Sequence, residues 1–238
     1  MRSIFTALSR ALQTLFHPKM LALVLWPMLA SLLLWSGIAI IFWRSWAADL
    51  ASWMDKAPFQ QWISAGFLAA VSGYVVAFIL IILLVPAIYA TALLITALFS
   101  MKAMVEHVSE KCYPHLERKM GGTFMGSLIN SLRVIIVFCL GWVITLPFWF
   151  FSPLAVLLPV IFSAYLNQGL FRYDALAEHA NRDEFAAIVH RAKVKLYLLG
   201  AMVGLLQYVP VLNFFSPVYS GLAFIHLCLE ELKTARAG

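Results

Sequence analysis

One uncharged stretch constrains this chain more than any other feature. Residues 134–171 contain no Asp, Glu, Lys or Arg and are interrupted by Pro147, Pro153 and Pro159. A helix that crosses the roughly 30 Å hydrocarbon core of a bilayer needs about 20 apolar residues, so this stretch is too long for one crossing and short for two. It predicts a helical hairpin with its tip inside the apolar layer. The second helix is expected to start at Ser152, because serine caps helices and proline favours the first helical position.

A similar pattern recurs further along the chain. Residues 196–229 are also uncharged, and the tetrapeptide Phe-Phe-Ser-Pro occupies both 150–153 and 214–217. We interpret the recurrence as a structural repeat. It predicts a second hairpin whose returning helix restarts at Ser216 and Pro217. The returning limb, from Pro217 to about Leu229, would be nearer 20 Å than 30 Å long, as would the first limb of the first hairpin, which favours half-membrane hairpins over four full crossings.

The composition of the chain indicates an integral membrane protein. Hydrophobic residues make up 63% and charged residues 12% of the 238, and mean hydropathy is +0.89. Soluble domains carry about 25% charged residues. The net charge of +6 does not indicate nucleic-acid binding, because the basic residues stand beside apolar runs, as cytoplasmic membrane flanks do. Cys112, Cys139 and Cys228 have no metal or redox spacing and are expected to be free thiols.

The N-terminal half predicts one surface helix and two membrane crossings. Residues 1–17 have apolar positions at helical spacing and are expected to form an amphipathic helix on the membrane surface. Residues 20–43 form a first crossing, and residues 44–56 a tryptophan-rimmed outer loop. A long kinked second crossing is expected over 62–100. The alternative is two crossings joined near Pro86.

The basic residues set the expected topology. Residues 102–133 and 172–195 each hold five Lys or Arg, whereas the two basic residues of the 44–56 loop are balanced by two acids. The positive-inside rule places that loop outside, and both termini, including the 230–238 tail, in the cytoplasm. The expected fold class is therefore an all-α integral membrane protein with two long transmembrane helices, two hemi-penetrating hairpins over 134–171 and 196–229, and the N-terminal amphipathic helix. Six full crossings satisfy the charge count equally.

An anion site is the chemistry that this arrangement suggests. A helix N-terminus exposes unpaired N–H groups and about half a positive charge, which favours an oxyanion. Ser152, Asn213 and Ser216 could supply donors at the hairpin tips, while Lys19 and Arg133 could gather anions at the cytoplasmic mouth. The alternative is that the serines only cap helices and the tips pack on each other.

The remaining ionisable residues suggest no catalysis. Arg172 and Asp174, two residues apart, are expected to anchor the hairpin at the interface or to act as a gating pair. No recognised metal-ligand spacing, nucleotide-binding loop or nucleophile motif occurs, so we expect no metal, no cofactor and no enzyme activity.

Several short motifs resemble a known family. They are Tyr165-Leu166-Asn167, the run Leu170-Phe171-Arg172-Tyr173-Asp174-Ala175-Leu176, Glu178-His179-Ala180, and Phe16-His17-Pro18-Lys19 followed by Leu25-Trp26-Pro27. Together they resemble the signature and entry segments of the CysZ and etoposide-induced-protein family. The resemblance implies a bacterial inner-membrane protein with hemi-penetrating hairpins. For the CysZ branch it implies sulfate uptake that feeds cysteine synthesis, without ATP-binding machinery, by an oligomer.

The chain departs from that family at one place. CysZ-like proteins have a glycine-leucine-arginine motif for sulfate near the start of the first crossing, whereas this chain reads Pro18-Lys19-Met20-Leu21 there. The resemblance leads us to expect a permease. Because the arginine of the motif is missing, its expected substrate is sulfate or a related small oxyanion. The alternative is a non-transporting membrane scaffold or biogenesis factor of the same fold. Beyond the lipid bilayer and the anion, the expected partner is a second copy of the chain, because incomplete crossings leave apolar surface to cover.

Overall fold

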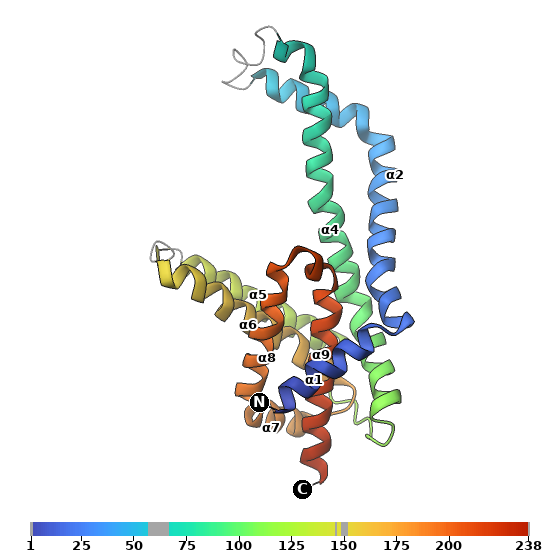
Figure 1. Cartoon of the computed structure of the whole chain (residues 1–238), viewed down its shortest axis with the longest axis vertical. Helices are drawn as coiled ribbons and strands as arrows, with labels where there is room; N and C mark the ends of the chain where they lie inside the picture. The colour runs from blue at the N-terminus through green and yellow to red at the C-terminus, as the bar shows by residue number, and fades with distance from the viewer. Residues whose placement is uncertain (1, 57–66, 146, 149–151, 238) are drawn as a thin grey trace. The chain divides into compact units, whose positions relative to one another are not determined.

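The computed structural model describes residues 2–56, 67–145, 147–148 and 152–237. Every regular element in those ranges is a helix, as expected of an all-α protein. Figure 1 shows α1 (Arg2–Leu15), α2 (Pro18–Lys56), α4 (Phe67–Cys112), α5 (Phe124–Thr145), α6 (Ser152–Ala177), α7 (Arg182–Arg191), α8 (Lys193–Leu205), the 3₁₀ helix η2 (Leu206–Tyr208) and α9 (Pro210–Ala237).

Three helices within the described residues are long and apolar enough to cross a membrane. Their spans are Pro18–Met54, Phe124–Thr145 and Leu212–Ala237. A membrane span must satisfy its backbone hydrogen bonds internally, and an apolar helix does so. The chain is therefore a helical membrane protein. How deeply each hairpin enters the bilayer stays a prediction.

Residues 25–95 form one compact unit, built from most of α2 and α4. Here the predicted loop over 44–56 is wrong, because α2 continues as helix to Lys56. The last turns of α2 cross the N-terminal part of α4 (Figure 1), and Met54 packs there on Val76 and Leu80. Burial of this apolar face keeps the segment helical although it carries charged residues.

The second crossing is one helix, not two. α4 runs through Pro86 without ending and continues to Cys112, twelve residues beyond the predicted end at 100. Pro114 then follows, as expected of a residue that stops a helix. Residues 62–66 of the predicted crossing lie outside the described residues.

Residues 1–24 and 96–238 form the second compact unit, and α9 lies in its core. The predicted amphipathic helix exists as α1, but its buried face is turned to the protein. Ile4, Ala7 and Ala11 are at most 3% exposed and pack into the core cluster that includes α9. Phe5 and Leu12 remain exposed on the other face.

The first predicted hairpin corresponds to α5 and α6, which lie against each other (Figure 1). α6 begins at Ser152, as predicted. α5 begins at Phe124, ten residues before the predicted start, and α6 continues to Ala177, six residues beyond residue 171. At 1.5 Å per residue the 22 residues of α5 extend about 33 Å, so the short limb expected from the sequence is wrong and α5 is long enough to cross a membrane.

The second hairpin is formed by α8, η2 and α9, but its returning helix does not restart at Ser216. α9 begins at Pro210, and Pro217 lies inside it. The chain turns through η2, and Val209 is extended before the helix starts. The preference of proline for the first helical position is thus satisfied by Pro210, and the second copy of the tetrapeptide is helix interior.

The carboxylate of Glu184 links three segments of this unit. A capping box begins α7, with the Glu184 N–H donating to Asn181 Oδ1 at 2.8 Å and the Asn181 N–H to Glu184 Oε2 at 3.0 Å. Glu184 also accepts from Lys119 at 2.7 Å and from Arg236 at 2.9 Å. These bonds join the 113–123 loop, α7 and the end of α9.

Candidate functional site

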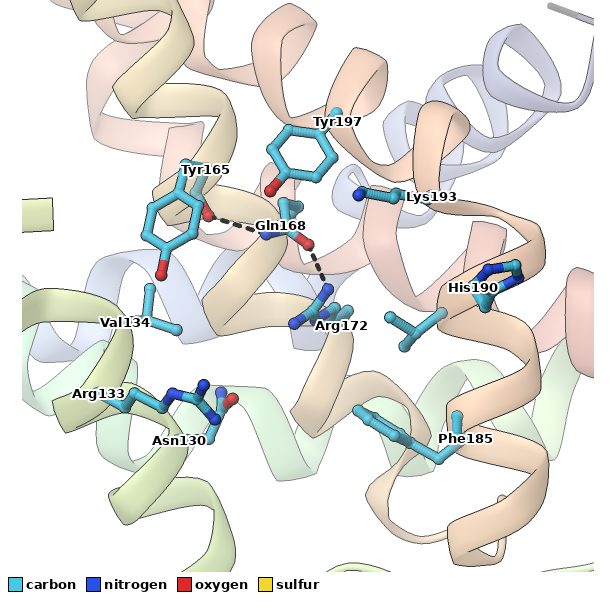
Figure 2. Close-up of a pocket in the computed structure, with 12 residues that line it drawn as sticks. Asn130, Arg133, Val134, Tyr165, Gln168, Arg172, Phe185, His190, Lys193 and Tyr197 are labelled. Carbon is cyan, nitrogen blue, oxygen red and sulfur yellow. Dashed lines mark hydrogen bonds between the residues drawn. The ribbon is translucent and has the colours of Figure 1, made fainter. Parts of the chain in front are cut away.

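A cavity of about 560 Å³ opens between α5, α6, α7 and α8 (Figure 2). Three of its lining residues, Arg133, Arg172 and Lys193, carry a positive charge at neutral pH, and none carries a negative charge. We call this space the basic cavity. It is lined by Asn130, Arg133, Val134, Tyr165, Gln168, Arg172, Phe185, Ala186, Val189, His190, Lys193 and Tyr197.

Helical spacing brings the polar lining residues onto single faces. Tyr165, Gln168 and Arg172 are three and four residues apart on α6, which places them on one side of that helix. Lys193 and Tyr197 are four residues apart on α8 and share a face in the same way. Helix α6 therefore supplies the centre of the cavity wall, and α8 supplies an adjoining wall.

Close packing sets the position of α5 against α6. A Cβ atom on Gly169 would lie 2.8 Å from both methyl groups of Val134, so glycine is needed at this contact. The Asn130 Nδ2 atom donates to the Gly169 carbonyl at 2.9 Å. Arg133, next to Val134, is thereby held at the edge of the basic cavity.

The guanidinium of Arg172 is held on one side and unpaired on the other. Its Nη1 atom donates to Gln168 Oε1 at 2.8 Å, and Gln168 Nε2 donates to the Tyr165 carbonyl at 3.3 Å (Figure 2). The Nε atom of Arg172 is buried without a hydrogen-bond partner. An unsatisfied buried donor costs about 1–3 kcal/mol. An acceptor atom of a ligand that reaches Nε would remove this cost by making the missing hydrogen bond.

Arg172 and Asp174 bond to other partners in this structure, and their gating role stays a prediction. Asp174 accepts a hydrogen bond from Ser127 Oγ on α5, and Arg172 bonds to Gln168 instead. The two side chains lie two residues apart on α6, a separation that places them on different faces of a helix. An anchoring role for them stays a prediction.

The other predicted anion-site residues lie elsewhere. Lys19 is the second residue of α2 and its backbone N–H donates to His17 Nδ1 at 3.3 Å. Asn213 lies in the first turn of α9, and Ser216 is buried further along that helix, with its Oγ unpaired. None of these three lines the basic cavity. Ser152 is the first residue of α6, whereas Ser216 is not at a helix N-terminus, so the dipole argument does not apply to it.

The sequence analysis missed Gln168, Lys193, Tyr165 and Tyr197 as parts of a site. A signal for two of them was present, since Tyr165 and Gln168 share a face with Arg172 in an otherwise apolar helix. In the sequence, Lys193 is one of five basic residues between 172 and 195, and nothing there distinguishes it from the others. In the described part of the chain, no three His, Cys, Asp or Glu residues come together as metal ligands.

The residues of the basic cavity lie within a region that matches a known protein family. No curated protein and no solved structure matches the chain. The family described as Sulfate transporter CysZ/Etoposide-induced protein 2.4 matches residues 7–217, which include every residue that lines the basic cavity. The chain therefore belongs to the CysZ/etoposide-induced protein 2.4 family.

Proposed function

We propose that this protein is a membrane permease for sulfate or a related small oxyanion, and that it works without ATP-binding machinery. The basic cavity carries the proposal, because three cationic side chains without a carboxylate among the lining residues favour an anion. The description of the family as a sulfate transporter agrees with this choice of ligand.

To bind an oxyanion, the basic cavity needs only positive charge and hydrogen-bond donors. Cations that surround a partly desolvated space lower the energy of an anion more than the same charges do in bulk water. Tyr165 and Tyr197 add hydroxyl groups to the lining, and Arg133 and Lys193 bring positive charge from two different helices. An oxyanion that leaves water can thus exchange part of its hydration shell for these donors.

The proposed setting is a bacterial inner membrane with both termini in the cytoplasm, as the distribution of basic residues favours. The hairpins of α5 with α6 and of α8 with α9 would enter the membrane from the cytoplasmic side and bring the basic cavity close to that side. α5 exposes Ile135, Ile136 and Leu140 along its length, and this apolar face would meet lipid or a second copy of the chain.

Uptake of radiolabelled sulfate into proteoliposomes tests the proposal. The wild-type protein should admit sulfate, and Arg133→Ala should reduce the rate about tenfold, as expected for the loss of one nearby charge at roughly 1.4 kcal/mol. Arg191→Ala is the matched control, because Arg191 is exposed on α7 and does not line the basic cavity. Lys19→Ala should also leave uptake unchanged. A folded protein that moves neither sulfate nor related oxyanions would contradict the permease and favour the scaffold.

A further inference from the structure

One edge of the Arg172 guanidinium is hydrogen-bonded within the protein, and the other edge has a donor without a partner. Nη1 is engaged by Gln168 Oε1 at 2.8 Å, whereas Nε, on the edge that Nε shares with Nη2, is buried and has no partner. Parallel N–H groups on such an edge fit two oxygen atoms of a sulfate, phosphate or carboxylate group at once. A lysine cannot offer this pair of donors.

Gln168 fixes which edge is free. Its side chain is only 1% exposed, and its amide is held at both ends, by the Tyr165 carbonyl and by Arg172. Because the amide accepts from Nη1, the guanidinium is oriented before any ligand arrives. Such preorganisation lowers the entropy lost when a ligand binds.

The surroundings suit a doubly charged, tetrahedral group. Figure 2 shows Arg133 and Lys193 extending from α5 and α8 toward the space that Arg172 faces. No carboxylate among the lining residues competes for the free edge. The cavity of about 560 Å³ is many times the ~30 Å³ that one water molecule occupies, so an oxyanion can enter with part of its hydration shell.

We propose that the Nε–Nη2 edge of Arg172 binds two oxygen atoms of a tetrahedral oxyanion, that Gln168 is the residue that positions this edge, and that Arg133 and Lys193 balance the charge. The inference rests on the proposed function in identifying the ligand with the transported anion. The same chemistry is present in a free sulfate or phosphate ion and in the phosphate of an anionic lipid headgroup.

Calorimetric titration of the purified full chain with sodium sulfate, in a detergent without phosphate, tests binding separately from transport. Arg172→Lys keeps the charge and should weaken sulfate binding about tenfold or more, because the paired donors are lost. Gln168→Met should weaken it about threefold to tenfold. The double variant should bind no more weakly than Arg172→Lys alone, because Gln168 acts through Arg172. Arg191→Lys is the matched control and should bind as the wild type does.

The outcomes separate the alternatives. Equal affinity of the wild type and Arg172→Lys overturns the proposal, and additive losses in the double variant overturn the role of Gln168. If Gln168→Met melts at a lower temperature without anion, Gln168→Glu replaces it. That variant keeps an acceptor for Nη1 but adds a negative charge, so it should bind sulfate more weakly than the wild type, and unchanged binding would contradict the site.

The same titration in nanodiscs distinguishes the two sources of the ligand. Phosphatidylglycerol that competes with sulfate for the wild type, but not for Arg172→Lys, identifies a lipid phosphate as an occupant of the site. An absence of competition identifies the free anion. Sulfate binding at Arg172 in a protein that transports no sulfate would contradict the permease and leave the binding site standing.

Discussion

The contact between α6 and α8 gives the sharpest test of the packing. A Cβ atom on Gly200 would lie 2.6 Å from the carbonyl oxygen of Ala164, which belongs to the backbone and cannot rotate away. Ordinary contact begins at 3.4 Å, so Gly200→Ala must push the two helices apart by about 0.8 Å. Gly37, in the middle of α2, has no neighbouring atom within 4 Å of the same position and is the matched control.

The expected cost follows from three contributions. Overpacking of this kind costs about 1–3 kcal/mol. The hydrogen bond from Asn167 Nδ2 to the Gly200 carbonyl, 3.1 Å long, weakens by about 0.5–1 kcal/mol. Alanine offsets about 1 kcal/mol through its higher helix propensity. Gly200→Ala should therefore be destabilised by about 0.5–3 kcal/mol, and Gly37→Ala should be neutral or up to about 1 kcal/mol more stable.

Thermal unfolding in detergent, followed by far-ultraviolet circular dichroism, measures the difference. For a chain of this size 1 kcal/mol corresponds to about 2–4 °C, so Gly200→Ala should melt about 1–12 °C lower than the wild type. Gly37→Ala should melt at the same temperature as the wild type or slightly higher. If both variants shift alike, the close approach of α6 and α8 is not what position 200 requires.

Three further predictions concern acid stability and α1. Hydrogen bonds from Arg236 and Lys119 lower the pKa of Glu184 from 4.5 to about 2, so stability present above pH 4.5 is lost as the pH falls toward 2. Glu184→Gln should cost about 1–2 kcal/mol at pH 7, after allowance for solvent screening, and should flatten that acid limb in urea titrations. Burial, with Arg118 and Arg236 nearby, lowers the pKa of His179 from 6.5 to about 4. Stability should therefore decline from pH 6.5 toward pH 4, and melting curves of His179→Leu should lack that decline. In α1, Ile4→Ala should cost about 2–5 kcal/mol by chemical denaturation, whereas the exposed Phe5→Ala should change stability little; equal losses would contradict the packing of α1 in the core.

The tetrapeptide Phe-Phe-Ser-Pro shows how far local sequence signals predict this fold. At Ser152 the signal is correct, and α6 starts there. At Ser216 the same letters lie inside α9, because Pro210 has already started the helix and Ser216 is buried among its neighbours. Capping preferences identify residues that can begin a helix, whereas the contacts of the folded chain decide which of them does.

Some residues of the basic cavity could likewise be predicted from the sequence, whereas others are placed there by packing between distant segments. Arg133 and Arg172 were predicted to flank the first hairpin, and a hairpin of α5 and α6 is enough to bring both to the basic cavity. Lys193 reaches it only because α8 lies close against α6, at a contact where Gly200 and Gly204 leave room for the facing helix. Such a contact depends on packing between segments about 30 residues apart in the chain, which apolar periodicity does not specify.

The unbalanced positive charge of the basic cavity has an energetic consequence in a polarised membrane. Moving one elementary charge through 100 mV takes about 2.3 kcal/mol, so a divalent anion that enters a cell with a negative interior works against about 4.6 kcal/mol. The positive side chains of the basic cavity lower the free energy of the anion while it is bound. They leave unchanged the difference in the anion's free energy between the two sides of the membrane. Under the proposed function, the residues of the basic cavity determine which ions enter and how fast. These residues do not supply the driving force for accumulation. It comes from a second gradient or from a reaction that consumes the anion inside the cell.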